Sequence, residues 1–213
     1  MARRKSTERL TQRRRRGRYA VQKVKMFLLL AVAAGLLTVA DRLGLFGRRP
    51  ASEAETYDGV TFAVVRVIDG DTLDVDRPDG DYPRTRVRLW GVDTPETKKP
   101  ETPVQHFGPE ATALTRDLCD GKKVRLELEP SRDRDDHGRL LAWVYLPDGR
   151  LLNRVLVTRG YAYADPRYEH HLSRELGRLQ SEARKASRGL WKDVREKDLP
   201  YYYRQGRHRI KLP

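Results

Sequence analysis

The chain of 213 residues has a single cysteine, Cys119. One cysteine excludes an internal disulfide and any zinc site built from several cysteines. Hydrophobic residues make up only 38% of the chain and charged residues 35%, which excludes an integral membrane bundle. The apolar residues nevertheless occur in periodic blocks, which excludes a disordered polymer. The length fits one domain of ordinary size with extensions.

Acidic residues are scarce at the two ends of the chain. The formal net charge is +14, and residues 1–25 alone hold eleven basic groups and one acid. Residues 199–213 hold four basic groups and no acid. Residues 51–198 hold 26 basic and 28 acidic groups, so the body of the protein is nearly neutral. A basic composition points to nucleic acid, but here the excess charge belongs to the ends.

Residues 26–40 (MFLLLAVAAGLLTVA) are fifteen uncharged residues that follow the basic segment. A basic segment before an apolar run is typical of a targeting signal, with the basic residues on the cytoplasmic side. Fifteen residues are short for a span of about 20, but residues 43–46 extend the run. We expect a transmembrane anchor with the body extracytoplasmic. A cleaved signal peptide, ending at Thr38-Val39-Ala40 and releasing a secreted protein, stays open as an alternative.

Changes in charge and hydrophobicity along the sequence divide the chain into five parts. We expect a basic cytoplasmic tail at 1–25, an anchor or signal segment at 26–46, a linker at 47–59, a globular domain at 60–192 and a basic C-terminal tail at 193–213, irregular from residue 201.

The globular domain reads as an α+β fold. Alternating or apolar runs rich in Val, Leu and Arg predict five strands at 60–68, 72–76, 85–90, 123–129 and 140–146. Pro109 opens a helix that ends at 120, and further helices are expected at 151–159 and 168–187. Five strands with about three helices favour a small closed barrel of the OB type.

Three charged clusters lie at strand ends, where a barrel can bring them together. In Asp69-Gly70-Asp71-Thr72, a tight turn presents carboxylates, the hard oxygen ligands that Ca²⁺ or Mg²⁺ prefers. The same four residues also fit an ordinary Asp-Gly turn that binds no metal.

The second cluster follows the third strand. Arg88 is followed closely by Asp93 and Glu96, with Pro95 fixing the backbone between them. Two acids and a guanidinium group can supply a metal ligand, a water-activating base and a charge stabiliser for phosphodiester cleavage. A solvated strand face is the alternative.

The third cluster, residues 133–139, mixes acids and bases just before a strand. Arg139 is the cation at the strand start, after a glycine that lets the backbone bend. The alternative is that residues 133–139 form an ordinary solvated loop without a functional role.

Together these motifs closely resemble the staphylococcal nuclease (thermonuclease) family over roughly residues 60–192. The resemblance lies in the order and spacing of Val67–Thr72, Arg88…Val92–Thr97, Gly108–Ala111, Asp135…Gly138–Ala142, Asn153…Gly160–Ala162 and Glu182…Trp191.

The resemblance implies an OB-fold, calcium-dependent, sugar-nonspecific endonuclease that cuts DNA and RNA and leaves 3′-phosphate ends. It implies that Asp71, Asp93 and the Thr94 carbonyl bind Ca²⁺. It also implies that Glu96 activates or orients water, and that Arg88 and Arg139 bind the phosphate. Such chemistry needs preplaced donors where negative charge develops.

The nucleic-acid contacts are less defined by the resemblance. Lys98 and Lys99 lie in a segment similar to the family's mobile loop, and His137 stands where the family commonly has an aromatic residue. Tyr163 and Tyr168 are candidates for stacking a base, although each also fits ordinary packing. His170 and His171 read as surface residues of the last helix without a role.

Two other function classes remain open. One is a catalytically silent OB-fold module that binds nucleic acid at the membrane, and the other is a surface scaffold whose basic ends bind polyanions. The intact set of site acids and arginines favours the enzyme. We expect it to be a monomer.

Overall fold

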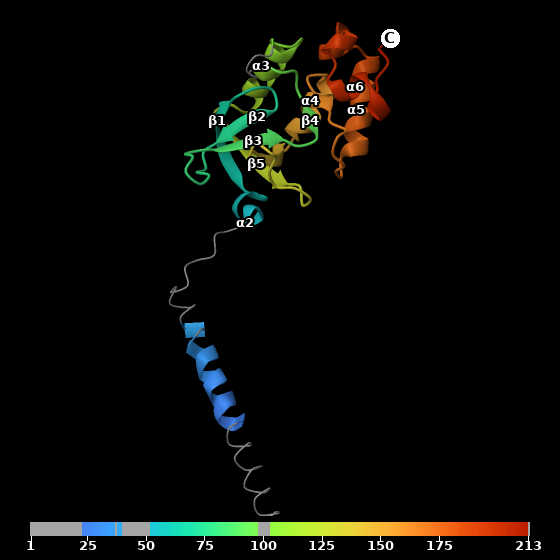
Figure 1. Ribbon diagram of the computed structural model, residues 1–213. Helices are drawn as coiled ribbons and strands as arrows, with labels where there is room; N and C mark the ends of the chain where they lie inside the picture. Colours follow the sequence, from blue (N-terminus) through green and yellow to red (C-terminus); the bar gives the residue numbers. More distant parts are fainter. Residues whose placement is uncertain (1–22, 37, 40–51, 98–102, 213) are drawn as a thin grey trace, which may run out of the picture. The chain divides into compact units, whose positions relative to one another are not determined.

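The computed structural model describes residues 23–36, 38–39, 52–97 and 103–212 (Figure 1). The chain divides into two compact units, Met1–Pro50 and Ala51–Pro213. In the first unit, residues 23–36 and 38–39 are helical. No helix in the described part of the chain is long and apolar enough to cross a membrane. Most of the predicted cytoplasmic tail, and part of the predicted anchor at 26–46, lie outside the described residues.

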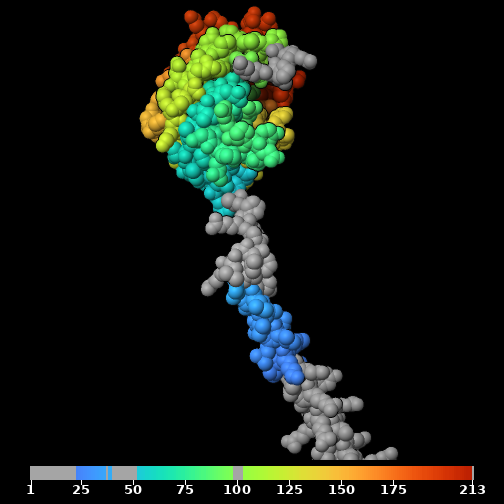
Figure 2. Space-filling model, turned by 90° about the vertical axis from the view of Figure 1, so that its left-hand side faces the viewer, coloured from blue at the N-terminus to red at the C-terminus, as the bar shows by residue number. Residues whose placement is uncertain are grey.

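The second unit is built on the five-stranded closed barrel that the sequence predicts. Around the barrel the strands run in the order β1-β2-β3-β6-β5. Neighbouring strands are antiparallel except β3 and β6, which are parallel. The strands are β1 (Thr61–Val67), β2 (Thr72–Val75), β3 (Thr85–Leu89), β5 (Lys123–Leu128) and β6 (Leu140–Tyr145). Figure 2 shows the face of this unit on which residues 52–97, in teal and green, predominate.

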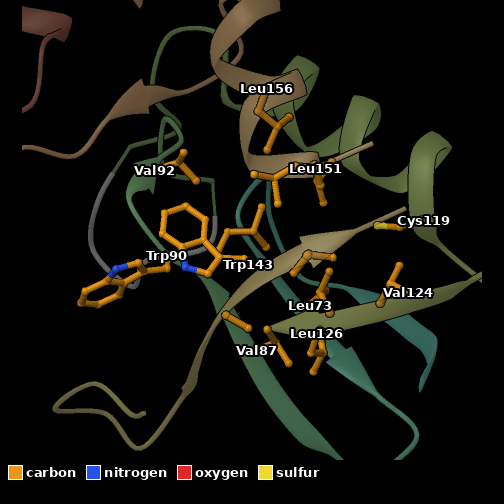
Figure 3. Packing of buried hydrophobic residues seen from close by; sticks show 14 of the residues in the cluster. Leu73, Val87, Trp90, Val92, Cys119, Val124, Leu126, Trp143, Leu151 and Leu156 are labelled. Carbon is orange, nitrogen blue, oxygen red and sulfur yellow. The ribbon is translucent and has the colours of Figure 1, made fainter. Parts of the chain in front are cut away.

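The apolar core fills the barrel and continues beneath the helices. Leu73, Val87 and Leu126 gather inside the barrel, while Trp90 lies at the edge of the cluster (Figure 3). The buried Cys119 donates its Sγ–H to the carbonyl oxygen of Thr115. Burial also raises the pKa of this thiol to about 12, so the cysteine is an apolar core residue.

Three helices of eight or more residues accompany the barrel, as expected: α3 (Gly108–Cys119), α4 (Leu152–Arg159) and α5 (Ser173–Lys185). Helix α4 ends at Arg159 and is capped by Gly160, whose φ of 73° favours glycine. A Cβ at Gly160 would lie 2.2 Å from the carbonyl oxygen of Arg188. This close approach lets the chain after α5, which includes the 3₁₀ turn Gly189–Lys192, pack onto the end of α4.

A second, two-stranded sheet was not anticipated. Strand β4 (Val92–Asp93) pairs antiparallel with β7 (Tyr163–Ala164), and Asp93 lies opposite Tyr163. Strands of two residues carry no alternation that a sequence can reveal. This sheet fixes the backbone of Asp93, one of the predicted site residues.

The predicted linker at 47–59 is wrong over its second half. Helix α2 (Glu53–Tyr57) begins with a capping box between Ser52 and Glu55. Tyr57 is only 3% exposed and its hydroxyl hydrogen-bonds to Thr85. The globular unit therefore already includes α2, while residues 47–51 lie outside the described part of the chain.

The predicted irregular tail is also corrected by the structure. Residues 196–198 and 206–208 form 3₁₀ turns, and α6 (Tyr201–Arg204) lies between them. Tyr202 and Tyr203 are 6% and 5% exposed and join a second core cluster with Leu190 and Trp191. Apolar tyrosine surface, rather than the flanking basic residues, determines how this segment folds.

Candidate active site

The first site residue, Asp71, lies where the turn after β1 leads into β2. A Cβ at Gly70 would lie 2.8 Å from the side chain of Thr94, so only glycine allows the two segments to approach so closely. Thr115 of α3 donates its hydroxyl to the carbonyl oxygen of Gly70 at 2.7 Å. These contacts place Asp71, which is 5% exposed, against Thr94, which follows the end of β4.

Arg88 reaches the same point from β3 because of the strand register. Thr72 lies opposite Arg88, and the amide of Leu89 donates to the carbonyl oxygen of Asp71 at 2.8 Å. The Arg88 side chain is 12% exposed and pairs through Nη1 with Asp71. Its Nη2 donates to Oδ1 of Asp93 at 2.9 Å. One guanidinium group therefore links two of the predicted metal ligands.

The third predicted ligand residue, Thr94, binds Asp71 directly. Its amide and hydroxyl donate to Oδ2 of Asp71 at 2.6 and 2.9 Å. Burial by itself would raise the pKa of Asp71, but the charge of Arg88 and the bonds from Thr94 outweigh it and hold that pKa below its ordinary value. Asp71 is thus kept ionised in a buried position.

Two neighbouring carboxyl groups are shifted in the opposite direction. Burial raises the pKa of Asp93, Asp71 adds to the rise, and Arg88 and a hydrogen bond from Tyr202 oppose it. Burial and the charge of Asp71 raise the pKa of Asp69 to about 7. Burial and the charge of Asp71 thus hold the pKa of Asp69 and Asp93 up, while Arg88 and Thr94 hold the pKa of Asp71 down.

This donor set fits a calcium ion. Asp71, Asp93 and the carbonyl oxygen of Thr94 are hard oxygen donors, which suit Ca²⁺. The described residues contain no group of three or more His, Cys, Asp or Glu side chains that could hold a metal. A metal held here therefore takes a backbone carbonyl or water in addition to the two carboxylates.

Glu96 follows at the base of the segment that leads to α3. Its Oε1 accepts from the amide of Thr97 at 2.9 Å. The backbone of Glu96 is tied to Gln105, whose side-chain oxygen accepts from the Glu96 amide and whose amide donates to the Glu96 carbonyl, both at 2.9 Å. These bonds fix both ends of the intervening segment, in which Lys98 and Lys99 lie outside the described residues.

Arg139 approaches from the loop before β6. Its Nε donates to Oδ2 of Asp135 at 2.7 Å, and its amide donates to Oδ1 of the same residue at 2.9 Å. Asp135 also accepts from the amide of His137 at 3.0 Å, so it organises the whole turn. The Arg139 side chain is 28% exposed.

Arg88 and Arg139 line one open pocket of about 180 Å³. Two further arginines, Arg132 and Arg167, face the same space. One wall carries Tyr168, which is stacked on Trp90 with 5.6 Å between the ring centroids and 29° between the ring planes. The guanidinium carbon of Arg132 lies 5.6 Å from the Tyr168 ring centre. The pocket thus combines donors for a phosphate with a flat aromatic surface.

The candidate nucleotide contacts have different outcomes. His137 lines the pocket and Tyr168 is 45% exposed beside it, so both are placed where a nucleotide can reach them. Tyr163 is 2% exposed and packs edge-on against Trp191 at 5.4 Å. Its proposed role in stacking a base is therefore wrong, because no face of its ring is accessible.

Both histidines lie before the last helix rather than on it, and only His171 is the surface residue that the sequence predicts. Helix α5 begins at Ser173, because the chain before it forms a turn in which the Leu172 amide donates to Nδ1 of His170. His170 is 8% exposed and lies edge-on to Trp143, so it is a core residue. His171 is exposed and hydrogen-bonds to Glu129 at 3.1 Å.

Sequence reasoning missed three residues around Asp93. Asp165 binds Arg167 through both carboxylate oxygens, and Arg167 lies 3.9 Å from Oδ2 of Asp93. Tyr202 donates its hydroxyl to the same oxygen at 2.8 Å. The only available signal was the run of three tyrosines at 201–203, whose aromatic character is unusual for a solvated tail.

A second groove of about 840 Å³ begins at Arg139 and His137 and runs along the loop between β2 and β3. Most of its arginines are already paired. Arg66 and Arg86 both bind Asp74, and Arg134 binds Glu53 and Asp79. The pocket around Arg88 remains the candidate for chemistry, because Arg88 connects it to the predicted metal ligands Asp71 and Asp93.

Comparison with known proteins places the chain in a family. The family described as "Staphylococcal nuclease homologue" matches residues 86–193. The chain is 34% identical over 174 residues to the thermonuclease of Staphylococcus hyicus. This alignment covers 80% of this chain and 99% of that protein. The chain is 40% identical over 168 residues to the thermonuclease of Staphylococcus intermedius, covering 77% of this chain and 94% of that protein. Endonuclease YncB of Bacillus subtilis (strain 168) is 39% identical over 110 residues, or 52% of this chain and 50% of that protein. On these matches the chain belongs to the staphylococcal nuclease homologue family.

Proposed function

We propose that the chain is a calcium-dependent, sugar-nonspecific endonuclease that hydrolyses DNA and RNA and leaves 3′-phosphate ends. Its family membership makes it a phosphodiester-hydrolysing nuclease. The observation that carries the finer proposal is the sharing of Arg88 between Asp71 and Asp93 at the edge of an arginine-lined pocket. A silent binding module is not favoured, because it has no need for buried acids beside its phosphate donors.

Arg88 and Arg139 supply the positive charge that the reaction needs. Attack on a phosphodiester adds negative charge to the non-bridging oxygens, and fixed donors at those oxygens stabilise the transition state. Both guanidinium groups are held by carboxylates, Arg88 by Asp71 and Asp93 and Arg139 by Asp135. They are therefore oriented before the substrate arrives, and little reorganisation is needed during the reaction.

Asp71, Asp93 and the Thr94 carbonyl would hold the calcium ion. When bound, the ion polarises a phosphoryl oxygen and makes a bound water more acidic. Glu96 accepts a proton from the attacking water or orients it, which requires the ionised carboxylate. The bond to the 5′ oxygen breaks, so the phosphate stays on the 3′ side.

A chelator-controlled cleavage assay tests this proposal. We expect the purified full chain to degrade single-stranded DNA and RNA with added Ca²⁺ and to stop when EGTA is added. Mass spectrometry of the products should find 3′-phosphate termini. The Arg88→Ala variant is the control for a contaminating nuclease, because it should lose the activity. Cleavage that continues unchanged in EGTA would contradict the calcium dependence.

We also propose that the apolar segment at 26–46 holds the nuclease at a membrane, with residues 1–25 cytoplasmic and the body extracytoplasmic. The support is the charge pattern around that segment and the exposure of its apolar side chains, such as Phe27 at 70% and Leu29 at 71%. Protease protection of membrane vesicles tests the orientation. A mature protein that begins at Asp41 would instead support the secreted form.

We also propose that the enzyme acts as a monomer, with one site in each chain. Size-exclusion chromatography with light scattering in detergent tests this. A dimer at assay concentrations would contradict it.

A further inference from the structure

The carboxylate of Asp93 is held on both of its oxygens. Oδ1 accepts from Arg88, and Oδ2 accepts the hydroxyl of Tyr202 at 2.8 Å. The nearest cation to Oδ2 among the ion pairs of the described residues is Arg167 at 3.9 Å. Of these two neighbours, only Tyr202 makes a hydrogen bond to that oxygen.

The phenol ring of Tyr202 is itself held in place. It is 6% exposed, and the guanidinium carbon of Arg167 lies 4.7 Å from its centre. Arg167 is fixed in turn by both oxygens of Asp165. Because the Tyr202 ring is buried and also contacts the Arg167 guanidinium group, its orientation is fixed, and its hydroxyl points toward Asp93.

Helix α6 is anchored to the strand that pairs with β4. The adjacent Tyr203 donates its hydroxyl to the carbonyl oxygen of Ala164 in β7. Gln180 of α5 joins both, donating to the Tyr203 hydroxyl and accepting from the Ala164 amide, each at 2.9 Å. Since β7 pairs with β4, the C-terminal segment is connected through hydrogen bonds to the backbone that carries Asp93.

This segment lies beyond the part of the chain that the family match covers, which ends at residue 193. Yet it reaches a carboxylate to which calcium binding is assigned above. A partner that orients a ligand carboxylate commonly affects metal affinity strongly, because the free ligand need not be ordered when the metal binds.

We propose that Tyr202 is a positioning residue that fixes the carboxylate of Asp93 for calcium, so that the C-terminal segment is a structural part of the active site. The inference rests on the proposed function, because it concerns the same metal site. Tyr202 touches neither the substrate nor the reacting atoms in this scheme, and it acts through Asp93 alone.

Calcium titration calorimetry on the full chain tests the inference. Tyr202→Phe keeps the ring, its packing and its contact with Arg167, and it removes only the hydroxyl. We expect the Kd for Ca²⁺ to rise about tenfold, as for the loss of a partner of a metal ligand. The Ca²⁺ concentration for half-maximal cleavage should rise by the same factor, while kcat at saturating Ca²⁺ stays close to that of the wild type.

Tyr163→Phe is the matched control. Tyr163 belongs to the same buried aromatic cluster, but its hydroxyl faces the carbonyl oxygen of Asp198 at 3.5 Å. Tyr163→Phe should bind Ca²⁺ like the wild type. Its unfolding midpoint in EGTA should be similar to that of Tyr202→Phe.

Three results would overturn the inference. The first is a Tyr202→Phe variant with wild-type Ca²⁺ affinity. The second is an equal loss of affinity in both variants, which would mean that the cluster acts only through folding. The third is a wild-type chain that shows no Ca²⁺ binding, and this result alone would overturn the proposed calcium dependence as well.

Discussion

Arg88 donates from Nη2 to Oδ1 of Asp93 at 2.9 Å, while Nη1 of the same guanidinium group pairs with Asp71. The arrangement needs two separate donors that diverge from one rigid plane. A lysine ammonium group is a compact point charge and cannot reproduce it. The relationship explains why an arginine, rather than a cation in general, stands at this position.

We therefore predict that Arg88→Lys abolishes most of the activity although it keeps the charge. Loss of a transition-state donor typically lowers kcat about 10²–10³-fold. Steady-state kinetics on single-stranded DNA measures the loss, and circular dichroism checks the fold. Arg86→Lys is the control, because Arg86 lies two residues earlier on the strand, is half-exposed, and pairs with Asp74 away from the pocket around Arg88. Near wild-type turnover in Arg88→Lys would show that the two diverging guanidinium donors are not needed.

Asp135 holds Arg139 in the direction of the pocket, and its removal should reduce activity without removing the arginine. Arg139 contributes both its Nε and its amide to this carboxylate. We predict that Asp135→Asn lowers kcat/KM about tenfold, within the range seen for partners that orient an active-site group.

The control for Asp135→Asn is Asp148→Asn. Asp148 accepts from the amide and Nε of Arg150 in a similar local motif, but it lies in an exposed turn away from the pocket. It should keep wild-type kinetics. Equal kinetics in the two variants would contradict a role for Asp135 in orienting Arg139.

The sequence predicts the barrel well because its strands have a strong local signal. Each of the five strands lies within two residues of its predicted bounds, as alternation and Gly- or Pro-rich turns require. Asp71, Arg88 and Asp93 could be grouped because they lie at strand ends, which a closed barrel brings to one edge. Their pairing through one guanidinium group depends on the strand register and could not be read from spacing.

The missed features share a different physical origin. Strands β4 and β7 have two residues each and α6 has four, so none shows a period. Tyr163 and Tyr168 look equivalent in the sequence, but only the pairing of β7 with β4 buries the first and leaves the second beside the pocket. Tertiary contacts, rather than local propensity, decided these positions.

The stacked pair of Trp90 and Tyr168 predicts where a base binds. We expect Tyr168→Ala to weaken binding of single-stranded DNA by about 1–3 kcal/mol, the usual contribution of one base stacked on an aromatic ring. Fluorescence anisotropy with a labelled oligonucleotide in EGTA measures affinity without cleavage. Tyr168→Phe should retain the affinity, because it keeps the ring. A Tyr168→Phe variant as weak as Tyr168→Ala would show that the hydroxyl, not stacking, matters.

His170 makes the stability of the fold depend on pH. Its ring is buried beside Trp143, and its Nδ1 accepts from the Leu172 amide, so the neutral form is the one that fits. Burial lowers the pKa of His170, and His171 lowers it further, against the opposing charges of Glu129 and Asp165. The unfolded chain thus binds this proton more tightly than the folded protein does.

The His170 ring therefore stabilises the fold less as the pH falls. Stability associated with His170 is complete above its ordinary pKa of 6.5 and declines as the pH falls from there toward the lowered folded value. We predict that His170→Asn, which keeps an acceptor near Nδ1, is less stable than the wild type at pH 7.5 because packing is lost. Its free energy of unfolding should nevertheless fall less between pH 7.5 and 5.5. Urea unfolding at the two pH values measures both quantities, and an equal fall in the two proteins would assign the acid sensitivity to other groups.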